Sequence, residues 1–117
     1  MNRFLACAIA AAFVFALAGA APPRAGTLDG TLTSYVSGNE GTDVLVKTSD
    51  GRKHRLWFDN LKKPIFEGKQ LPWCPDFPCD GWPKRLVIGK SLVRVTFVVK
   101  TVDGVTVDSP TKIELLH

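Results

Sequence analysis

The amino-acid sequence predicts an all-β domain of five strands with one long connection between the third and the fourth. Several short segments alternate apolar and polar residues with a period of two, as half-buried strands do. Glycine-containing turn signals separate two pairs of these segments. Residues 60–89 contain five prolines, a density that excludes a long helix from the connection.

The first twenty residues have the layout of a secretory signal peptide. A short charged start precedes an apolar run from Phe4 to Ala21, and Ala18-Gly19-Ala20 forms a small-x-small cleavage site. We therefore expect cleavage after Ala20 and a periplasmic or secreted protein. A permanent membrane anchor is the alternative, because eighteen apolar residues are about enough to cross a bilayer. The many small residues in the run, and the two prolines that follow it, favour the signal peptide.

An exposed leader, residues 21–26, is expected before the first strand because it contains two prolines and three small residues. The first strand is predicted over residues 27–36, with the even-numbered positions, including Val36, on its apolar face. Gly30 lies inside this run, where the missing side chain lets a strand bend. One folded domain is expected to cover residues 27–117, a length that suits a single core.

Two hairpins supply the other four strands. The second and third, residues 42–48 and 52–59, are joined by a Ser-Asp-Gly turn signal. The fourth and fifth, residues 91–100 and 105–116, are joined by an Asp-Gly pair. The apolar residues expected to point inward are Leu56, Phe58, Val93, Val95, Phe97 and Val99. Val44 and Val46 share one face of the second strand, and the fifth strand keeps Val105, Val107, Ile113 and Leu115 on one parity.

The long connection contains the stretch WCPDFPCDGWP, residues 73–83. Once a signal peptide is removed, Cys74 and Cys79 are the only cysteines, and in an oxidising compartment they are expected to be bridged. Four residues separate them, which is neither a thioredoxin-like spacing nor half of a two-cluster zinc site, so a structural disulfide is favoured over redox or metal chemistry. Closing so short a loop contributes about 2 kcal/mol and fixes a local shape.

The order of these elements resembles the OB-fold, a small five-stranded barrel. A glycine-bent first strand, a hairpin, a long connection and a second hairpin together cover Thr27 to Leu116. In the OB-fold the connection after the third strand usually holds a helix, and here a proline-rich, disulfide-closed loop takes its place. The chain is also similar to small secreted bacterial proteins of uncharacterised role with this kind of barrel. The resemblance rests on element order and implies no site residues; an SH3-like barrel or a small sandwich is the competing architecture.

Positive charge is concentrated in the middle of the chain. Residues 47–100 contain twelve lysines and arginines against five aspartates and glutamates, a net charge of +7. A basic face of this kind attracts an anionic partner such as nucleic acid, phospholipid headgroups or an acidic glycan. The alternative is an ordinary soluble surface.

Aromatic residues mark the candidate binding surface. Alternation places Trp57 on the outward face of the third strand beside Lys53 and Arg55, a combination that can stack a base or a sugar ring. The alternative is that the disulfide loop covers Trp57. Within the loop, at least one tryptophan is expected to pack on the barrel, and Phe77, at the tip, to be the most exposed aromatic residue. The candidate ligand-binding residues are Lys53, Arg55, Trp57, Trp73, Phe77 and Trp82.

The sequence lacks a recognisable catalytic constellation. His54 shares a strand face with core residues, and Asp76 and Asp80 lack the further oxygen ligands that a calcium site needs. No catalytic residue, metal or cofactor is therefore expected. We expect a non-catalytic binding module for an anionic or ring-containing ligand. The alternative is an envelope component that docks another protein through residues 73–82 or through an exposed strand edge.

Overall fold

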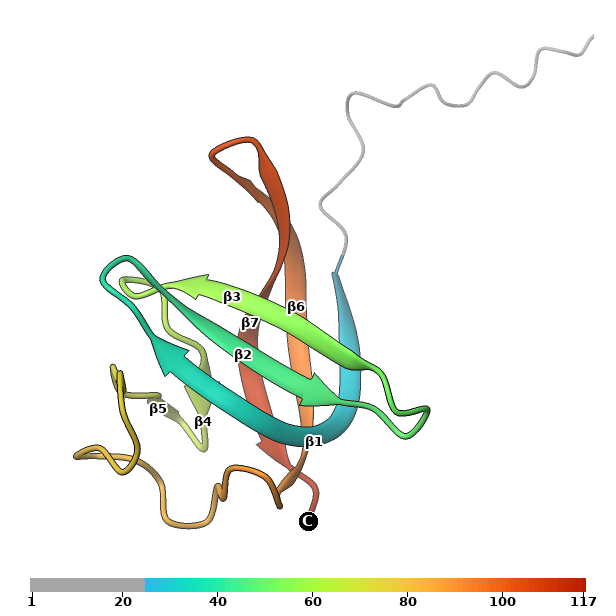
Figure 1. The fold of residues 1–117 in the computed structure, drawn as a ribbon, viewed down its shortest axis with the longest axis vertical. Coiled ribbons are helices and arrows are strands. Elements are labelled where there is room, and N and C mark those ends of the chain that lie inside the picture. The colour runs from blue at the N-terminus through green and yellow to red at the C-terminus, as the bar shows by residue number, and fades with distance from the viewer. Residues whose placement is uncertain (1–24) are drawn as a thin grey trace, which may run out of the picture.

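The structure is a computed structural model that describes residues 25–117, so the expected signal peptide and most of the leader lie outside the described residues (Figure 1). This part of the chain is all-β, as predicted. Residues 25–117 contain no helix that is long and apolar enough to cross a membrane. Its strands are β1 (Ala25–Ser37), β2 (Gly41–Lys47), β3 (Lys53–Asp59), β4 (Ile65–Phe66), β5 (Lys69–Gln70), β6 (Leu92–Val102) and β7 (Val105–Leu115).

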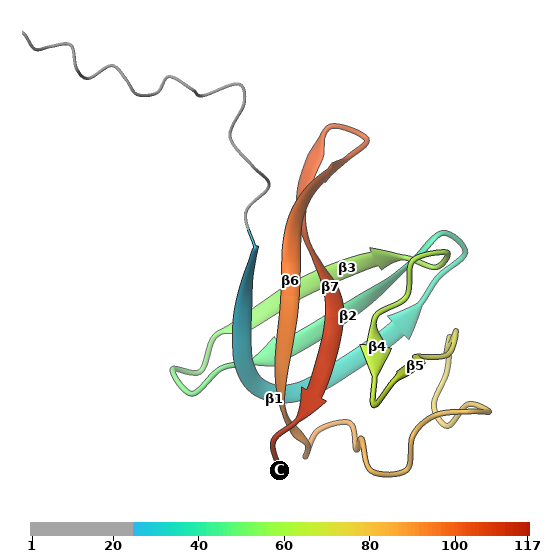
Figure 2. The ribbon, with the colours of Figure 1, turned by 180° about the vertical axis from the view of Figure 1, so that it is seen from behind.

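These strands form one open sheet in the order β3-β2-β1-β6-β7-β4-β5. The expectation of a closed barrel is therefore corrected, because β3 and β5 are edge strands that no hydrogen bonds join. The curvature of β1 nevertheless folds the sheet over, so that β3 packs against β7 without pairing with it (Figures 1 and 2). The five long strands lie where the sequence predicts them, and β4 and β5 are two short additions inside the connection.

The long connection joins the sheet through a parallel pairing. Ile65 and Phe66 in β4 lie opposite Lys112 and Ile113 in β7. A positive φ of 83° at Gly68 allows the tight turn between β4 and β5. The connection is thus attached to the sheet edge before it reaches the disulfide loop.

Strand β1 takes part in both halves of the sheet. Its first half pairs with β6, beginning with Ala25 opposite Val98, and its second half pairs with β2. Two residues of the predicted leader, Ala25 and Gly26, therefore belong to the sheet. The halves meet at Thr31, which pairs with both neighbours. At the preceding residue, Gly30, a Cβ atom would lie 2.4 Å from the carbonyl oxygen of Lys47. Only glycine allows so close an approach of the two backbones.

A β-bulge changes which side of β1 faces the core. The register with β2 shifts between Leu32 and Ser34, which inserts one extra residue. Beyond the bulge, Tyr35 is buried, whereas Val36 is 51% exposed. The prediction that Val36 lies on the apolar face is therefore wrong, because one inserted residue exchanges the two faces of a strand.

The far part of the β6–β7 hairpin, residues 99–108, extends beyond the rest of the sheet, and we call it the arm (Figures 1 and 2). The sequence predicted that Val99 points inward and that Val105 and Val107 share one strand face with Ile113. Ile113 is buried, but none of the three valines is, and Val105 is 59% exposed. The expected alternation is present here. What is missing is a second layer for these side chains to pack against.

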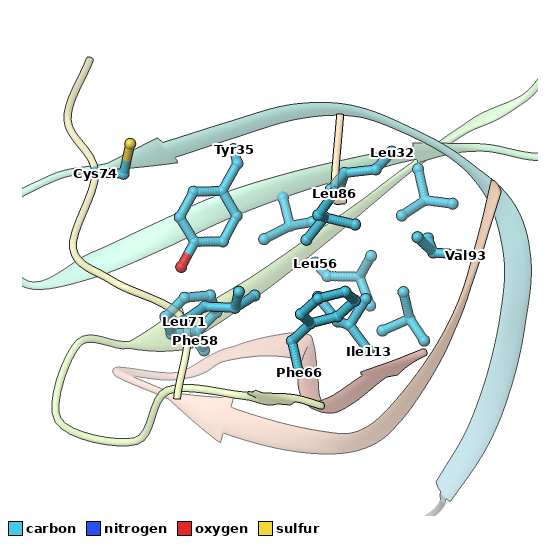
Figure 3. Packing of buried hydrophobic residues seen from close by; sticks show 13 residues of the cluster. Leu32, Tyr35, Leu56, Phe58, Phe66, Leu71, Cys74, Leu86, Val93 and Ile113 are labelled. Atoms are coloured by element: carbon cyan, nitrogen blue, oxygen red, sulfur yellow. The ribbon is translucent and has the colours of Figure 1, made fainter. Parts of the chain in front are cut away.

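The core is shared between the sheet and the long connection (Figure 3). The sheet contributes Leu32, Tyr35, Val44, Val46, Leu56, Phe58, Val93, Val95 and Ile113, together with Phe66 from β4. The rest of the connection contributes Leu71, Cys74 and Leu86, all of them almost fully buried. The proline-rich connection therefore completes the core by burying apolar side chains against the sheet.

Candidate functional site

The disulfide loop is fixed to the sheet at its base. Cys74 and Cys79 form the predicted disulfide, and Cys74 is completely buried. The Tyr35 hydroxyl donates a hydrogen bond to the carbonyl of Pro72 (3.0 Å), and the Trp73 indole N–H donates to the carbonyl of Gly38 (2.9 Å). The loop therefore starts from a well-defined position on β1 and the turn that follows it.

Trp82 and Phe77 pack back onto the sheet from the loop. The Trp82 ring lies edge-to-face with Tyr35, with ring centroids 4.7 Å apart. The Phe77 ring in turn lies edge-to-face with Trp82 at 4.8 Å. This confirms that at least one of the loop tryptophans packs on the body of the protein. Burial raises the pKa of the Tyr35 phenol, because a charged phenolate would be poorly solvated in this aromatic cluster.

Phe77 is not the most exposed of the three loop aromatics, contrary to the prediction. Trp73 is 50% exposed and Phe77 is 40% exposed. The reason is the fold of the loop, which turns the Phe77 ring back towards Trp82 and Tyr35. Trp73 instead lies along the β1–β2 turn, held there by its indole hydrogen bond.

Trp57 lies on the outward face of β3 with Lys53 and Arg55, as strand alternation predicts. Its indole covers Gly41, where a Cβ atom would lie 1.9 Å from the ring. Among the aromatic pairs that the described residues form, Trp57 belongs to none. The rings that pack against the loop are instead on the inner side of the sheet. Among the six predicted site residues, the aromatic pairs therefore bring together only Phe77 and Trp82.

The positive charge of the central segment is partly neutralised by ion pairs. Each of the four arginines in residues 25–117 lies beside a carboxylate: Arg52 with Asp50, Arg55 with Asp43, Arg85 with Glu67 and Arg94 with Asp29. The Arg94 hydrogen bonds, at 2.8 and 2.9 Å, lower the pKa of the Asp29 carboxyl. Arginines committed in this way are less available to an external anion.

An open apolar groove of about 470 Å³ lies beside the disulfide loop. Its walls come from the loop and from the segment that leads to β6. Apolar side chains make up most of the surface, and Lys84 is the single charged residue in it. The groove is lined by Phe77, Pro78, Cys79, Trp82, Pro83, Lys84, Leu86, Val87 and Ile88. A second hollow, of about 370 Å³, is more polar and includes Glu67, Lys69 and Gln70.

Sequence reasoning missed the second wall of the groove. Residues 84–88 follow the loop as two cations and three aliphatic residues, and Val87 stays 44% exposed. An aliphatic run outside any strand was the available signal. Tyr35, on which Trp82 packs, was also missed, because the bulge in β1 reverses its predicted direction.

The described residues contain no group of three or more His, Cys, Asp or Glu side chains that could hold a metal ion. No protein-family model, curated protein or solved structure matches this chain. The geometry of the groove and of the charged groups around it therefore carries the functional argument.

Proposed function

We propose that this protein is a non-catalytic binding module that holds a ring-containing ligand in the groove beside the disulfide loop. The observation that carries the proposal is the edge-to-face pair of Phe77 and Trp82 at the groove wall, with Phe77 still 40% exposed. Small-molecule sites are concave and mostly apolar, with a few polar groups. Aromatic walls with part of their surface accessible are suited to stacking another ring.

A periplasmic or secreted location is part of the proposal. The disulfide between Cys74 and Cys79 supports it, because disulfides persist in oxidising compartments. The bridge also serves the site directly, since Phe77, Pro78 and Cys79 lie within or at the closed loop and line the groove.

The outer face of β3 is the weaker candidate surface. Arg55 is hydrogen-bonded to Asp43 at 2.7 Å, and Trp57 lies over Gly41. A ligand on this face would have to compete with Asp43 for the guanidinium group. Of the two predicted cations on this face, only Lys53 remains outside the ion pairs that residues 25–117 form.

Calorimetric titration of naphthalene-based compounds into two variants tests the proposal. Phe77→Ala should weaken binding about fivefold, because it removes one aromatic contact of about 1 kcal/mol. Trp57→Phe is the matched control and should leave the affinity unchanged. If the Trp57 variant loses affinity and the Phe77 variant does not, the site is on the outer face of β3 and the proposal is wrong.

Docking of another protein chain is a second candidate function, favoured by the arm. Within the described residues, β6 has no partner beyond Val98 on the side of β1, and β7 pairs with β4 only at Lys112 and Ile113. Unpaired strand edges can accept an additional strand, and Val105 exposes apolar surface beside them.

Amide hydrogen exchange in the presence of an envelope extract tests this second function. Protection of residues 99–108 against exchange would support docking on the arm. Protection confined to residues 73–82 would place docking on the disulfide loop, and unchanged exchange in both segments would exclude it.

A further inference from the structure

The surface that the groove presents to a ligand is mostly apolar. The Trp82 indole N–H donates to the carbonyl of Leu86 at 2.6 Å, and the Trp82 backbone N–H donates to the carbonyl of Cys79 at 3.3 Å. The Leu86 N–H donates to the carbonyl of Pro83 at 3.1 Å, and Pro78 and Pro83 have no N–H. These polar groups are thus used within the protein, and most of the surface of the groove lining is apolar.

The backbone N–H and carbonyl of Val87, the most exposed aliphatic residue of the groove, also form hydrogen bonds within the protein. Its N–H donates to the Ser91 hydroxyl at 2.7 Å, and its carbonyl accepts hydrogen bonds from Lys90 and Ser91 at 3.1 and 2.9 Å. A ligand rich in hydroxyl or amide groups would give up hydrogen bonds to water here and gain few in return. Sugars and nucleobases therefore suit this groove poorly.

Lys84 supplies the one charge in the groove lining. Its neighbour Arg85 is paired with Glu67, whereas Lys84 belongs to none of the ion pairs that residues 25–117 form. No carboxylate lines the groove; Asp76 and Asp80, in the loop, lie outside its lining. An ammonium group beside an apolar hollow attracts a single anionic group.

We infer that the ligand of this groove is a small anionic amphiphile, with one negatively charged group, an apolar ring or chain, and few other polar groups. The inference rests on the proposed function, because it specifies the ligand of the same groove. The apolar part lies against Phe77, Trp82 and Ile88, and the anionic group lies at Lys84. A volume of about 470 Å³ is within the usual range for small-molecule sites.

Three probes that share one ring and differ in charge test the inference: naphthylacetate, which is anionic, naphthylethanol, which is neutral, and naphthylethylammonium, which is cationic. With the wild-type protein, the anion should bind about fivefold more tightly than the neutral compound, as expected for one partly exposed charge pair. Lys84→Gln should remove this preference and leave the affinity for the neutral compound unchanged. Lys62→Gln, a lysine outside the groove lining, is the matched control and should keep the preference.

The outcomes separate the two claims. Equal affinity for the anion and the neutral compound would overturn the inference and leave the groove as a ring-binding site. Tightest binding of the cation would also overturn it, and would point to Asp76 or Asp80. If none of the three probes binds the wild-type protein, the proposed function itself is wrong. If the Lys84→Gln variant still prefers the anion, a group outside this groove recognises the charge, and the inference is overturned.

Discussion

The hydroxyl oxygen of Ser37 accepts a hydrogen bond from the backbone N–H of Cys74 at 2.9 Å, while the Ser37 N–H donates to the carbonyl of Cys74 at 3.2 Å. This reciprocal pair joins the end of β1 to the disulfide loop. The Thr42 hydroxyl donates to the Asn60 side-chain oxygen at 2.7 Å, so Ser37 must be the donor in its own 2.9 Å bond to Thr42. One chain of hydrogen bonds therefore links two strands, the loop and the long connection.

Ser37→Ala should lower the free energy of unfolding by about 2 kcal/mol, because it leaves the buried Cys74 N–H without an acceptor. Urea denaturation measures the change. Ser49→Ala, in the exposed β2–β3 turn, is the control and should change stability by less than about 0.5 kcal/mol. Equal effects of the two substitutions would show that the hydrogen-bond chain does not stabilise the fold.

Trp82→Ala should destabilise the protein more than replacement of both cysteines by serine. The tryptophan packs on the core and its removal costs about 3 kcal/mol, whereas a disulfide that closes so short a loop contributes about 2 kcal/mol. Phe77→Ala should cost about 1 to 2 kcal/mol, the value of its two aromatic pairs with Trp82 and Tyr35. Thermal and urea unfolding midpoints rank the three variants. If Phe77→Ala proves the most damaging, the loop is a structural plug and the groove proposal loses its support.

Substituting Gly30 or Gly41 by alanine should lower the free energy of unfolding by different amounts. Gly30→Ala places a Cβ atom 2.4 Å from a backbone oxygen that cannot move freely. We therefore expect it to lower the free energy of unfolding by about 3 kcal/mol. Gly41→Ala collides with the Trp57 ring, which can swing outward into solvent, so a loss of about 1 kcal/mol is expected. Unfolding measurements compare them, and tryptophan fluorescence should change only for Gly41→Ala. The reverse ranking would contradict the packing described at the β1 bend.

Stability should fall at alkaline pH through Tyr35, the single tyrosine of the chain. Burial raises the pKa of this phenol in the folded protein above its ordinary value of about 10. The folded state thus favours the neutral phenol, so its contribution is complete below pH of about 10 and is lost as the pH rises further. Tyrosinate absorbance should appear only together with unfolding. Tyrosinate that appears while the protein is still folded would contradict this prediction, and Tyr35→Phe should flatten the alkaline fall in stability.

The five long strands were predictable because their signals are local. Alternation and a Gly-containing turn define the β2–β3 hairpin within a short window. The bulge in β1 was not predictable in this way, since Leu32 to Val36 reads as an uninterrupted alternation. Whether β4 pairs with β7 depends on residues far apart in the sequence, and two-residue strands leave almost no pattern.

The disulfide, and the packing of at least one of the two loop tryptophans on the sheet, were predictable from the sequence. The groove was not, because its second wall, residues 84–88, becomes a wall only through the position of the loop opposite it. The sequence alone also did not show which arginines pair with carboxylates. Asp29 and Arg94 lie on neighbouring strands that the sequence does not identify as partners.

The division of β1 between two partners has a consequence for biosynthesis. Translation completes β1 first, and its second half can pair with β2 after a short turn. Residues 25–31 cannot pair until β6 has been synthesised, and β6 follows the entire proline-rich connection. Closing so long a loop is slow, so a nascent chain presents one unpaired strand edge for an extended period. Chaperones that hold extended segments would find their binding site at this edge, and docking of β6 is the step that removes it.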